Sequence, residues 1–138
     1  MLIAPRAMRV DAEAGVCAHA DSERLLQVVT NLVANAVKHT DGNDAILLSA
    51  GRNNGHALLR VSDSGRGIPS GELSRVFERF YRGADERAAE PEGSGLGLAI
   101  ARSLVQSMHG TIDVDSTLGR GTTFTIRLPL WRHPAARA

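Results

Sequence analysis

The chain has 138 residues, of which 43% are apolar and 22% are charged, the length and composition of one globular domain. Sixteen basic and fifteen acidic side chains leave a formal net charge of +1, so no overall field favours nucleic acid or an anionic membrane. The single cysteine, Cys17, excludes an internal disulfide, and no apolar run is long enough to span a membrane. Residues 1–10 lack the apolar core of a signal peptide, so we expect a soluble, cytoplasmic protein.

The N-terminal residues carry only weak structural signals. Residues 1–9 show no periodicity and are expected to form a lead-in. In residues 10–20, apolar and polar side chains alternate roughly, which suits an edge strand or a hairpin broken at Gly15. We therefore place the domain at residues 10–130 and a C-terminal tail at residues 131–138.

A helix is predicted over residues 21–39, with Asp21 or Ser22 as its N-cap. At the helical period, one side carries apolar residues that we expect in the core: Leu25, Leu26, Val29, Leu32, Val33 and Ala36. The other side carries Gln27, Asn31, Asn35 and Lys38. Asparagine is a poor helix former, so two of them one turn apart indicate that their amides are used.

Two apolar runs, at residues 45–50 and 56–61, predict strands joined in a hairpin by the turn-forming residues 52–55. The second run leads directly into Asp63-Ser64-Gly65-Arg66-Gly67-Ile68-Pro69. A carboxylate at a strand end, followed by two glycines and a proline, predicts a loop at the end of a sheet, where binding sites are common. A plain Asx turn is the alternative reading of the same residues.

A short helix is predicted at residues 71–80, followed by a polar segment. Phe77, Phe80 and Tyr81 make up most of the aromatic residues of the chain and form either a docking cluster or part of the core. Arg79 and Arg82 flank them. Residues 83–92 are polar and unpatterned, with the composition of a mobile lid.

The stretch Gly93-Ser94-Gly95-Leu96-Gly97-Leu98 has glycines at alternate positions and runs into an apolar helix. Leu98, Ala101, Leu104 or Val105, and Met108 form the expected buried face, and His109-Gly110 ends the helix. Glycines before a helix N-terminus favour a phosphate, although this spacing matches neither common phosphate-binding motif. Two strands, at residues 111–116 and 122–128, are predicted to close the chain around a turn at 119–121.

Four stretches, in this order, resemble the boxes of a known family. Asn31 to His39, Asp63 to Gly67, Val76 to Gly83 and Gly93 to Leu98 resemble the N box, first glycine box, F box and second glycine box of sensor histidine kinase catalytic domains. These domains belong to the GHKL, or HATPase, superfamily with the Bergerat fold, together with gyrase, Hsp90 and MutL. The resemblance implies an α/β (α+β) two-layer sandwich: a mixed, mainly antiparallel sheet of about five strands, helices on one face and a nucleotide lid.

The resemblance also implies ATP and Mg²⁺ as cofactors and gives roles to single residues. Asn35 matches the magnesium ligand. Asn31 stands where gyrase-type relatives carry a catalytic Glu, and because it carries an amide instead of a carboxylate, Asn31 cannot act as a base. Asp63 matches the residue that accepts a hydrogen bond from the adenine amine, which favours ATP over GTP. Lys38 and Arg82 are expected to meet phosphate, with Arg79 as a helper. The other expected nucleotide contacts are His39, Gly65, Gly67, Ile68, Tyr81, Gly93, Ser94, Gly95, Leu96, Gly97, Leu98 and Thr123; the catalytic set is Asn31, Asn35, Lys38 and Arg82.

The five histidines lack the acidic neighbour and nearby proline of the family's phosphoacceptor. The resemblance therefore implies transfer of the γ-phosphoryl of ATP to a His on a separate dimerisation domain, with a response regulator as an indirect partner. We expect this chain alone to be monomeric, and its parent protein can be anchored in the inner membrane. The alternatives are a serine kinase of the anti-sigma-factor type and a degenerate nucleotide-binding regulatory module.

Overall fold

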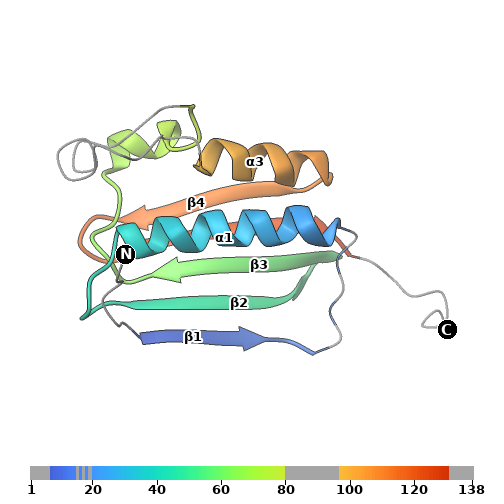
Figure 1. Cartoon of the computed structure of the whole chain (residues 1–138), viewed down its shortest axis with the longest axis horizontal. Helices are drawn as coiled ribbons and strands as arrows, with labels where there is room; N and C mark the ends of the chain where they lie inside the picture. The colour runs from blue at the N-terminus through green and yellow to red at the C-terminus, as the bar shows by residue number, and fades with distance from the viewer. Residues whose placement is uncertain (1–6, 15, 17, 19, 80–96, 131–138) are drawn as a thin grey trace, which may run out of the picture.

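The fold is built on one mixed sheet of five strands in the order β1-β2-β3-β5-β4. The computed structural model describes residues 7–14, 16, 18, 20–79 and 97–130. The strands are β1 (Ala7–Ala12), β2 (Ala45–Asn53), β3 (His56–Asp63), β4 (Thr111–Thr117) and β5 (Gly121–Pro129). Helices α1 (Ser22–Lys38) and α3 (Gly97–Ser107) form one layer on one face of this sheet (Figure 1). The predicted two-layer architecture is confirmed.

Strand β1 is an edge strand, as expected, but it begins at Ala7 and does not form a hairpin. It pairs with β2 in parallel, with Val10 opposite Leu48, whereas every other pair of strands in the sheet is antiparallel. Parallel neighbours need a long crossover connection, and α1 supplies it. Gly15, where the hairpin was expected to turn, lies outside the described residues.

Helix α1 starts at the expected cap. The side chain of Asp21 accepts hydrogen bonds from the backbone N–H groups of Glu23 and Arg24, at 3.0 and 3.1 Å. The helix ends at the C-cap His39, with Lys38 in its last turn, where a cation favours the helix dipole. Both ends agree with the predicted helix.

The buried face of α1 is rotated from the one predicted. Val28, which was not in the predicted set, is fully buried together with Leu32, and Ala36 is nearly so, whereas Leu26 is 68% exposed. Further apolar residues lie on either side of Leu32 around the helix. The sequence alone therefore did not decide how α1 is rotated about its own axis. Leu26 lies about 120° around the helix from Leu32, at about 100° per residue, and therefore points away from the core.

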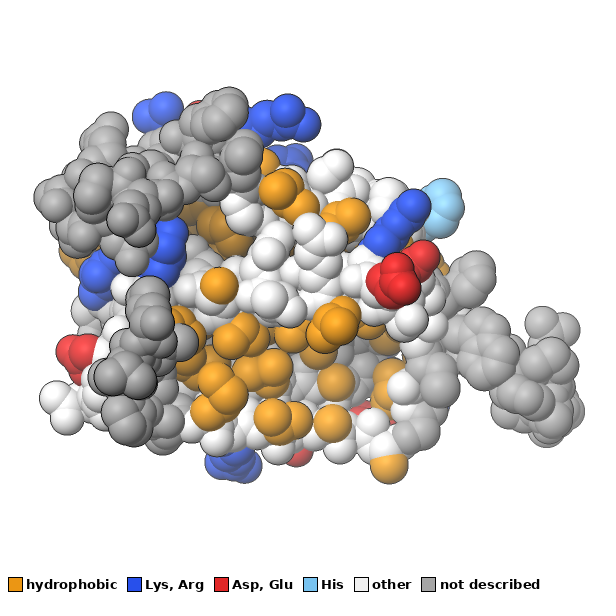
Figure 2. Space-filling view, viewed as in Figure 1, with side chains coloured by type: hydrophobic (Ala, Val, Ile, Leu, Met, Phe, Trp, Pro, Cys, Tyr) orange, Lys and Arg blue, Asp and Glu red, His pale blue; other side chains and the backbone are white. Residues whose placement is uncertain are grey.

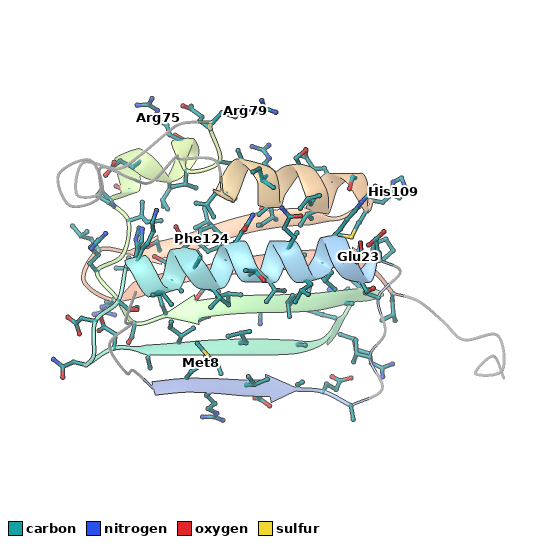
Figure 3. The ribbon with its side chains drawn as sticks, viewed as in Figure 1. Met8, Glu23, Arg75, Arg79, His109 and Phe124 are labelled. Carbon is teal, nitrogen blue, oxygen red and sulfur yellow. The ribbon has the colours of Figure 1, made fainter. Side chains whose placement is uncertain are left out.

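Helix α3 buries the predicted face. Ala101 and Val105 are fully buried and Met108 is 6% exposed, in one cluster with Leu32 of α1 and Phe124 of β5. Figure 3 shows Phe124 in the region between the two helices and the sheet. This cluster fixes the helices against the central strands β3 and β5, whose ends carry the site.

The helix layer leaves part of the sheet face uncovered. In the described part of the chain no helix covers β1, where Met8 is 54% and Val10 is 69% exposed. Figure 2 shows the apolar side chains gathered beside α1 on this side of the molecule. Among the described residues, no helix is long and apolar enough to cross a membrane.

The turns between strands follow the sequence closely. Asn54 and Gly55 have φ angles of 51° and 78°, a left-handed pair that closes the β2–β3 hairpin as predicted. At the end of α3, His109 and not the glycine takes the left-handed conformation, with φ 63°. Gly110 is needed for a different reason: a Cβ there would lie 2.5 Å from the carbonyl oxygen of Arg127.

The predicted helix at residues 71–80 is shorter than expected. The structure has a 3₁₀ helix, η1 (Ser70–Arg75), after which Val76 is buried and Phe77 half-buried. The Phe77 ring meets Phe124 edge-on at 6.0 Å between centroids, and the Arg102 guanidinium lies 5.5 Å from the Phe77 centroid. The helix ends early because Val76 and Phe77 turn into the core. Phe80 and Tyr81, the rest of the predicted aromatic cluster, lie outside the described residues.

Candidate functional site

Asp63 is the last residue of β3, and it is only 9% exposed. Its Oδ1 accepts a hydrogen bond from the Gly65 N–H at 2.9 Å. Burial raises the pKa of the Asp63 carboxyl above its ordinary value; backbone hydrogen bonds from Gly65 and Thr122 and the charge of His39 act against this rise. A nearby carboxylate, Asp44, raises the pKa further. A buried acceptor held at a strand end by backbone N–H groups is preorganised to receive a donor from a ligand.

The first glycine box lies against the C-terminal end of α1. A Cβ at Gly65 would lie 2.0 Å from the carbonyl oxygen of His39, so only glycine allows this approach. The Arg66 N–H donates to the same carbonyl at 3.2 Å. The His39 N–H in turn shares the carbonyls of Asn35 and Ala36, at 3.3 and 3.2 Å. The N box and the Asp63 loop are thus joined through the backbone.

The second half of the loop is fixed by the β4–β5 hairpin. Gly67 has φ 74°, and a Cβ there would lie 2.3 Å from the carbonyl oxygen of Thr117. The next residue, Ile68, is buried, and its N–H donates to Ser116 Oγ at 2.8 Å. Ser116 Oγ also lies 2.9 Å from the carbonyl oxygen of Gly121 and 2.8 Å from Thr122 Oγ1. One serine hydroxyl therefore ties the glycine loop to the hairpin.

Thr123, an expected nucleotide contact, lies on the other face of the sheet from Asp63. In the β3–β5 register, Asp63 is opposite Thr122, and Thr123 is opposite Ser62, whose hydroxyl it meets at 2.9 Å. Side chains alternate between faces along a strand, so Thr122, which is 2% exposed, shares the face of Asp63. The sequence did not single out Thr122, because the face that each threonine takes depends on the strand register, which residue patterns alone do not give.

The N-box stripe of α1 is placed beside α3. Asn31 and Asn35 are both half-buried, and Asn31 Nδ2 donates to the Gly97 carbonyl at 3.1 Å. At the other end of α3, Arg24 Nη1 donates a hydrogen bond to Ser107 Oγ at 3.2 Å. The start of α1 therefore lies beside the end of α3, and the two helices run antiparallel. Asn35, one turn beyond Asn31, consequently lies past the N-terminal end of α3. Lys38, in the last turn of α1, is exposed, and His39 is half-buried.

The N-terminal turn of α3 is exposed at Gly97. A Cβ at this position would meet no atom of the described residues within 4 Å. Gly97 and Leu98 are both expected nucleotide contacts. Leu98 is half-buried and packs against the core, so packing holds its side chain in place. The preceding residues of the second glycine box, Gly93, Ser94, Gly95 and Leu96, lie outside the described residues.

The arginines of the F box are only partly described. Arg79 is exposed, and Figure 3 shows Arg75 and Arg79 near the η1 end of the molecule, away from the sheet. Arg75 pairs with Glu78 at 3.3 Å, an exposed pair of the kind that adds little to stability. Tyr81, Arg82 and the predicted lid at residues 83–92 lie outside the described residues.

The described residues could hold a magnesium ion only if a bound ligand supplied further oxygen atoms. In the part of the chain that is described, no group of three or more His, Cys, Asp or Glu residues is placed to hold a metal ion. Asn35 offers one hard, neutral amide oxygen, and Mg²⁺ is commonly held by one or two protein oxygens together with substrate phosphates and water. A phosphate-bearing ligand would therefore have to supply part of the coordination shell.

Residues 20–132 match the family described as histidine kinase-, DNA gyrase B-, and HSP90-like ATPases. Over 109 residues, 79% of this chain, the sequence is 41% identical to the sensor protein SrrB of Staphylococcus aureus. The fold is similar to that of the mycobacterial sensor histidine kinase MprB, with a TM-score of 0.81 and 32% identity over 92% of this chain and 85% of that one.

The fold is also similar to that of full-length ShkA in complex with AMPPNP, with a TM-score of 0.79 and 30% identity. That match covers 92% of this chain and 26% of ShkA. The match to SrrB covers 19% of its length, so the chain spans about one fifth of the curated relative that it resembles.

Proposed function

Because the chain belongs to the histidine kinase-, DNA gyrase B- and HSP90-like ATPase family, as a domain of the sensor histidine kinase type, we propose that it binds Mg-ATP at the Asp63 site. We further propose that it transfers the γ-phosphoryl group to a histidine on a separate dimerisation domain. The observation that carries this proposal is the buried Asp63 carboxylate, held at the strand end by the Gly65 N–H. A buried carboxylate is costly, and a ligand that donates to it would offset that cost.

Adenine recognition follows from the chemistry of this carboxylate. The exocyclic amine of adenine is a donor and pairs with Asp63, whereas guanine would present a carbonyl oxygen to the same acceptor. Thr122, on the same face and directly opposite Asp63, is a second polar group within the proposed base site. Gly65 and Gly67 keep the loop backbone free of side chains, and Ile68 gives it an apolar edge. His39 would line the same region from the end of α1.

The phosphate chain would lie between α1 and the N-terminal turn of α3. When bound, Mg²⁺ would neutralise charge on the phosphate oxygens, with the Asn35 amide oxygen as its protein ligand. Lys38 would add a point charge near the same phosphates, and Gly97 would leave room for them. Arg82, with Arg79 as a helper and the glycines of residues 93–97 as phosphate loop, completes the proposed phosphate contacts.

The proposed chemistry is transfer and not hydrolysis. Asn31 carries an amide, which cannot take a proton from water, so no base is expected at this position. Phosphoryl transfer depends mainly on positioning and on charge stabilisation, which these residues would supply. The acceptor histidine, and through it a response regulator, are the proposed partners. The proposed compartment is the cytoplasm, where ATP is available, and the chain by itself is expected to be monomeric.

The transfer assay uses this chain, radiolabelled γ-³²P-ATP, Mg²⁺ and a separately produced dimerisation domain that carries the phosphoacceptor histidine. We expect label on the dimerisation domain that is stable to alkali and lost in acid, as phosphohistidine is. Acid-stable label would favour the serine-kinase alternative. ATP binding without any transfer to a panel of such domains would favour the regulatory module and contradict the proposed kinase activity.

A further inference from the structure

Helices α1 and α3 are joined by a side-chain hydrogen bond at the proposed phosphate end. Asn31 Nδ2 donates to the Gly97 carbonyl oxygen at 3.1 Å, across 66 residues of sequence. Gly97 is the first residue of α3, so by helix geometry its carbonyl is also placed to accept the intrahelical hydrogen bond from the Ala101 N–H. A carbonyl oxygen has two lone pairs and can accept both. The Asn31 amide therefore contacts the first turn of α3 directly.

This bond depends on the donor character of the asparagine. Asparagine costs helix propensity at position 31, and a residue with only an acceptor could not make the contact. Aspartate has nearly the same shape, but it would place a negative oxygen opposite the carbonyl oxygen. Asn31 is half-buried, but its bond to Gly97 is exposed to solvent, so water can partly replace a lost partner and the cost of losing the bond stays near that of one ordinary hydrogen bond.

No contact with the described part of the chain demands glycine at position 97. Gly97 is helical, and a Cβ there would meet no described atom within 4 Å. Glycine at a helical position normally weakens the helix relative to alanine. No described residue packs against the Cα of Gly97, which lies next to the Asn31 contact.

We propose that Asn31 is a positioning residue that holds the first turn of α3 at a fixed place relative to Asn35. The proposal rests on the proposed function, because the N–H groups of that turn are the ones that would receive the phosphate chain. Asn31 acts through the Gly97 carbonyl and not as a ligand of the metal ion. Asn35, one turn further along α1, keeps the role of metal ligand.

The test compares Asn31→Ala and Asn31→Asp with Thr30→Ala. Thr30 is exposed on the same helix, and its hydroxyl donates to the Leu26 carbonyl of α1 itself, at 2.8 Å. Hydrogen exchange of the Ala101 amide is measured in the ligand-free proteins, with urea unfolding to confirm that each is folded. Dissociation constants are then measured for ATP, as a function of Mg²⁺ concentration, and for adenosine.

We expect faster exchange at Ala101 in both Asn31 variants and wild-type exchange in Thr30→Ala. The ATP affinity of Asn31→Ala should fall about two- to tenfold, the value of one hydrogen bond, and that of Asn31→Asp should fall further. Adenosine affinity and the Mg²⁺ midpoint should stay within about twofold of wild type, because base site and metal ligand are intact.

Unchanged exchange at Ala101 would overturn the proposal, whether or not the protein binds nucleotide. Loss of the Mg²⁺ dependence would overturn it by making Asn31 a metal ligand, and an equal loss of adenosine affinity would overturn it by showing that Asn31 supports the whole site and not the position of α3. If the wild-type protein bound neither ATP nor adenosine, the proposed function would fail, and the exchange measurement would still decide whether Asn31 fixes α3.

Discussion

Gly65→Ala tests how the first glycine box is held. The added Cβ would lie 2.0 Å from the His39 carbonyl oxygen and 3.0 Å from Asp63 Oδ1. A carbonyl at the end of a packed helix cannot retreat by the ångström that this contact needs, so the loop must move. Its movement breaks the Gly65 N–Asp63 Oδ1 bond of 2.9 Å and the Arg66 N–His39 O bond of 3.2 Å.

The cost follows from these two bonds. A hydrogen bond to a charged acceptor contributes about 1.5–3 kcal/mol and a neutral one about 0.5–1.5 kcal/mol, so the free energy of unfolding should fall by about 2–4.5 kcal/mol. For a domain of this size, that is a fall in Tm of about 6–15 °C. Because Asp63 loses its fixed orientation, ATP affinity should also fall at least about tenfold.

The assay is urea unfolding followed by circular dichroism, with ATP titration under native conditions, and Gly71→Ala is the matched control. Gly71 is exposed, and a Cβ there would meet none of the described atoms within 4 Å. Alanine at this position should leave stability unchanged or raise it by up to about 1 kcal/mol. If Gly65→Ala unfolds at the same urea concentration as Gly71→Ala and binds ATP normally, the contact between Gly65 and the His39 carbonyl does not hold the loop.

Three further substitutions test other parts of the site. Burial raises the folded-state pKa of Asp63, so its contribution to the free energy of unfolding should decrease as pH rises from 3.8 through the folded-state value. In urea unfolding across this range, wild type should lose stability relative to Asp63→Asn as pH rises; a relative gain would contradict the burial effect. Gly97→Ala should fold with equal or up to about 1 kcal/mol greater stability but bind ATP more weakly in calorimetry, and unchanged affinity would exclude a phosphate beside Gly97. Ser116→Ala removes the acceptor of the Ile68 N–H and should lower the free energy of unfolding by about 1–3 kcal/mol in the same urea assay, whereas a loss below about 0.5 kcal/mol would show that water replaces the hydroxyl.

Local signals in the sequence predicted most of the elements correctly. Asp21 was identifiable as a helix cap because its side chain bonds N–H groups only two and three residues away. The Asn54–Gly55 turn was identifiable because its backbone angles favour these two residue types. Asp63 was also identifiable from its neighbours in the sequence, because it ends an apolar run and precedes two glycines.

The features that were missed depend on contacts between distant segments. Leu26 was expected in the core and Val28 was not, because the rotation of α1 is set by α3 and the sheet. Thr123 was named and Thr122 was not, because the one of two adjacent threonines that shares the face of Asp63 is decided by the β3–β5 register. The short η1 reflects Phe77, whose partners Phe124 and Arg102 come much later in the chain.

The roles of the glycines show the same division. Gly65 and Gly110 were expected as loop and helix-ending residues, and the structure shows that each avoids a clash with a distant backbone carbonyl. His109 takes the left-handed position at the end of α3 that glycine was expected to take. Composition predicts where a chain turns, but close approach between segments is a property of the packed fold.

Isothermal titration calorimetry of ATP with Mg²⁺ tests the central claim most directly, with GTP as competitor and Asp63→Asn as the matched variant. We expect one ATP per chain, no displacement by GTP, and at least about tenfold weaker binding by Asp63→Asn, because the acceptor for the adenine amine is lost or misoriented. Absence of binding at millimolar ATP in a folded sample would contradict the account. Equal competition by GTP, or full affinity in Asp63→Asn, would contradict the placement of adenine at Asp63.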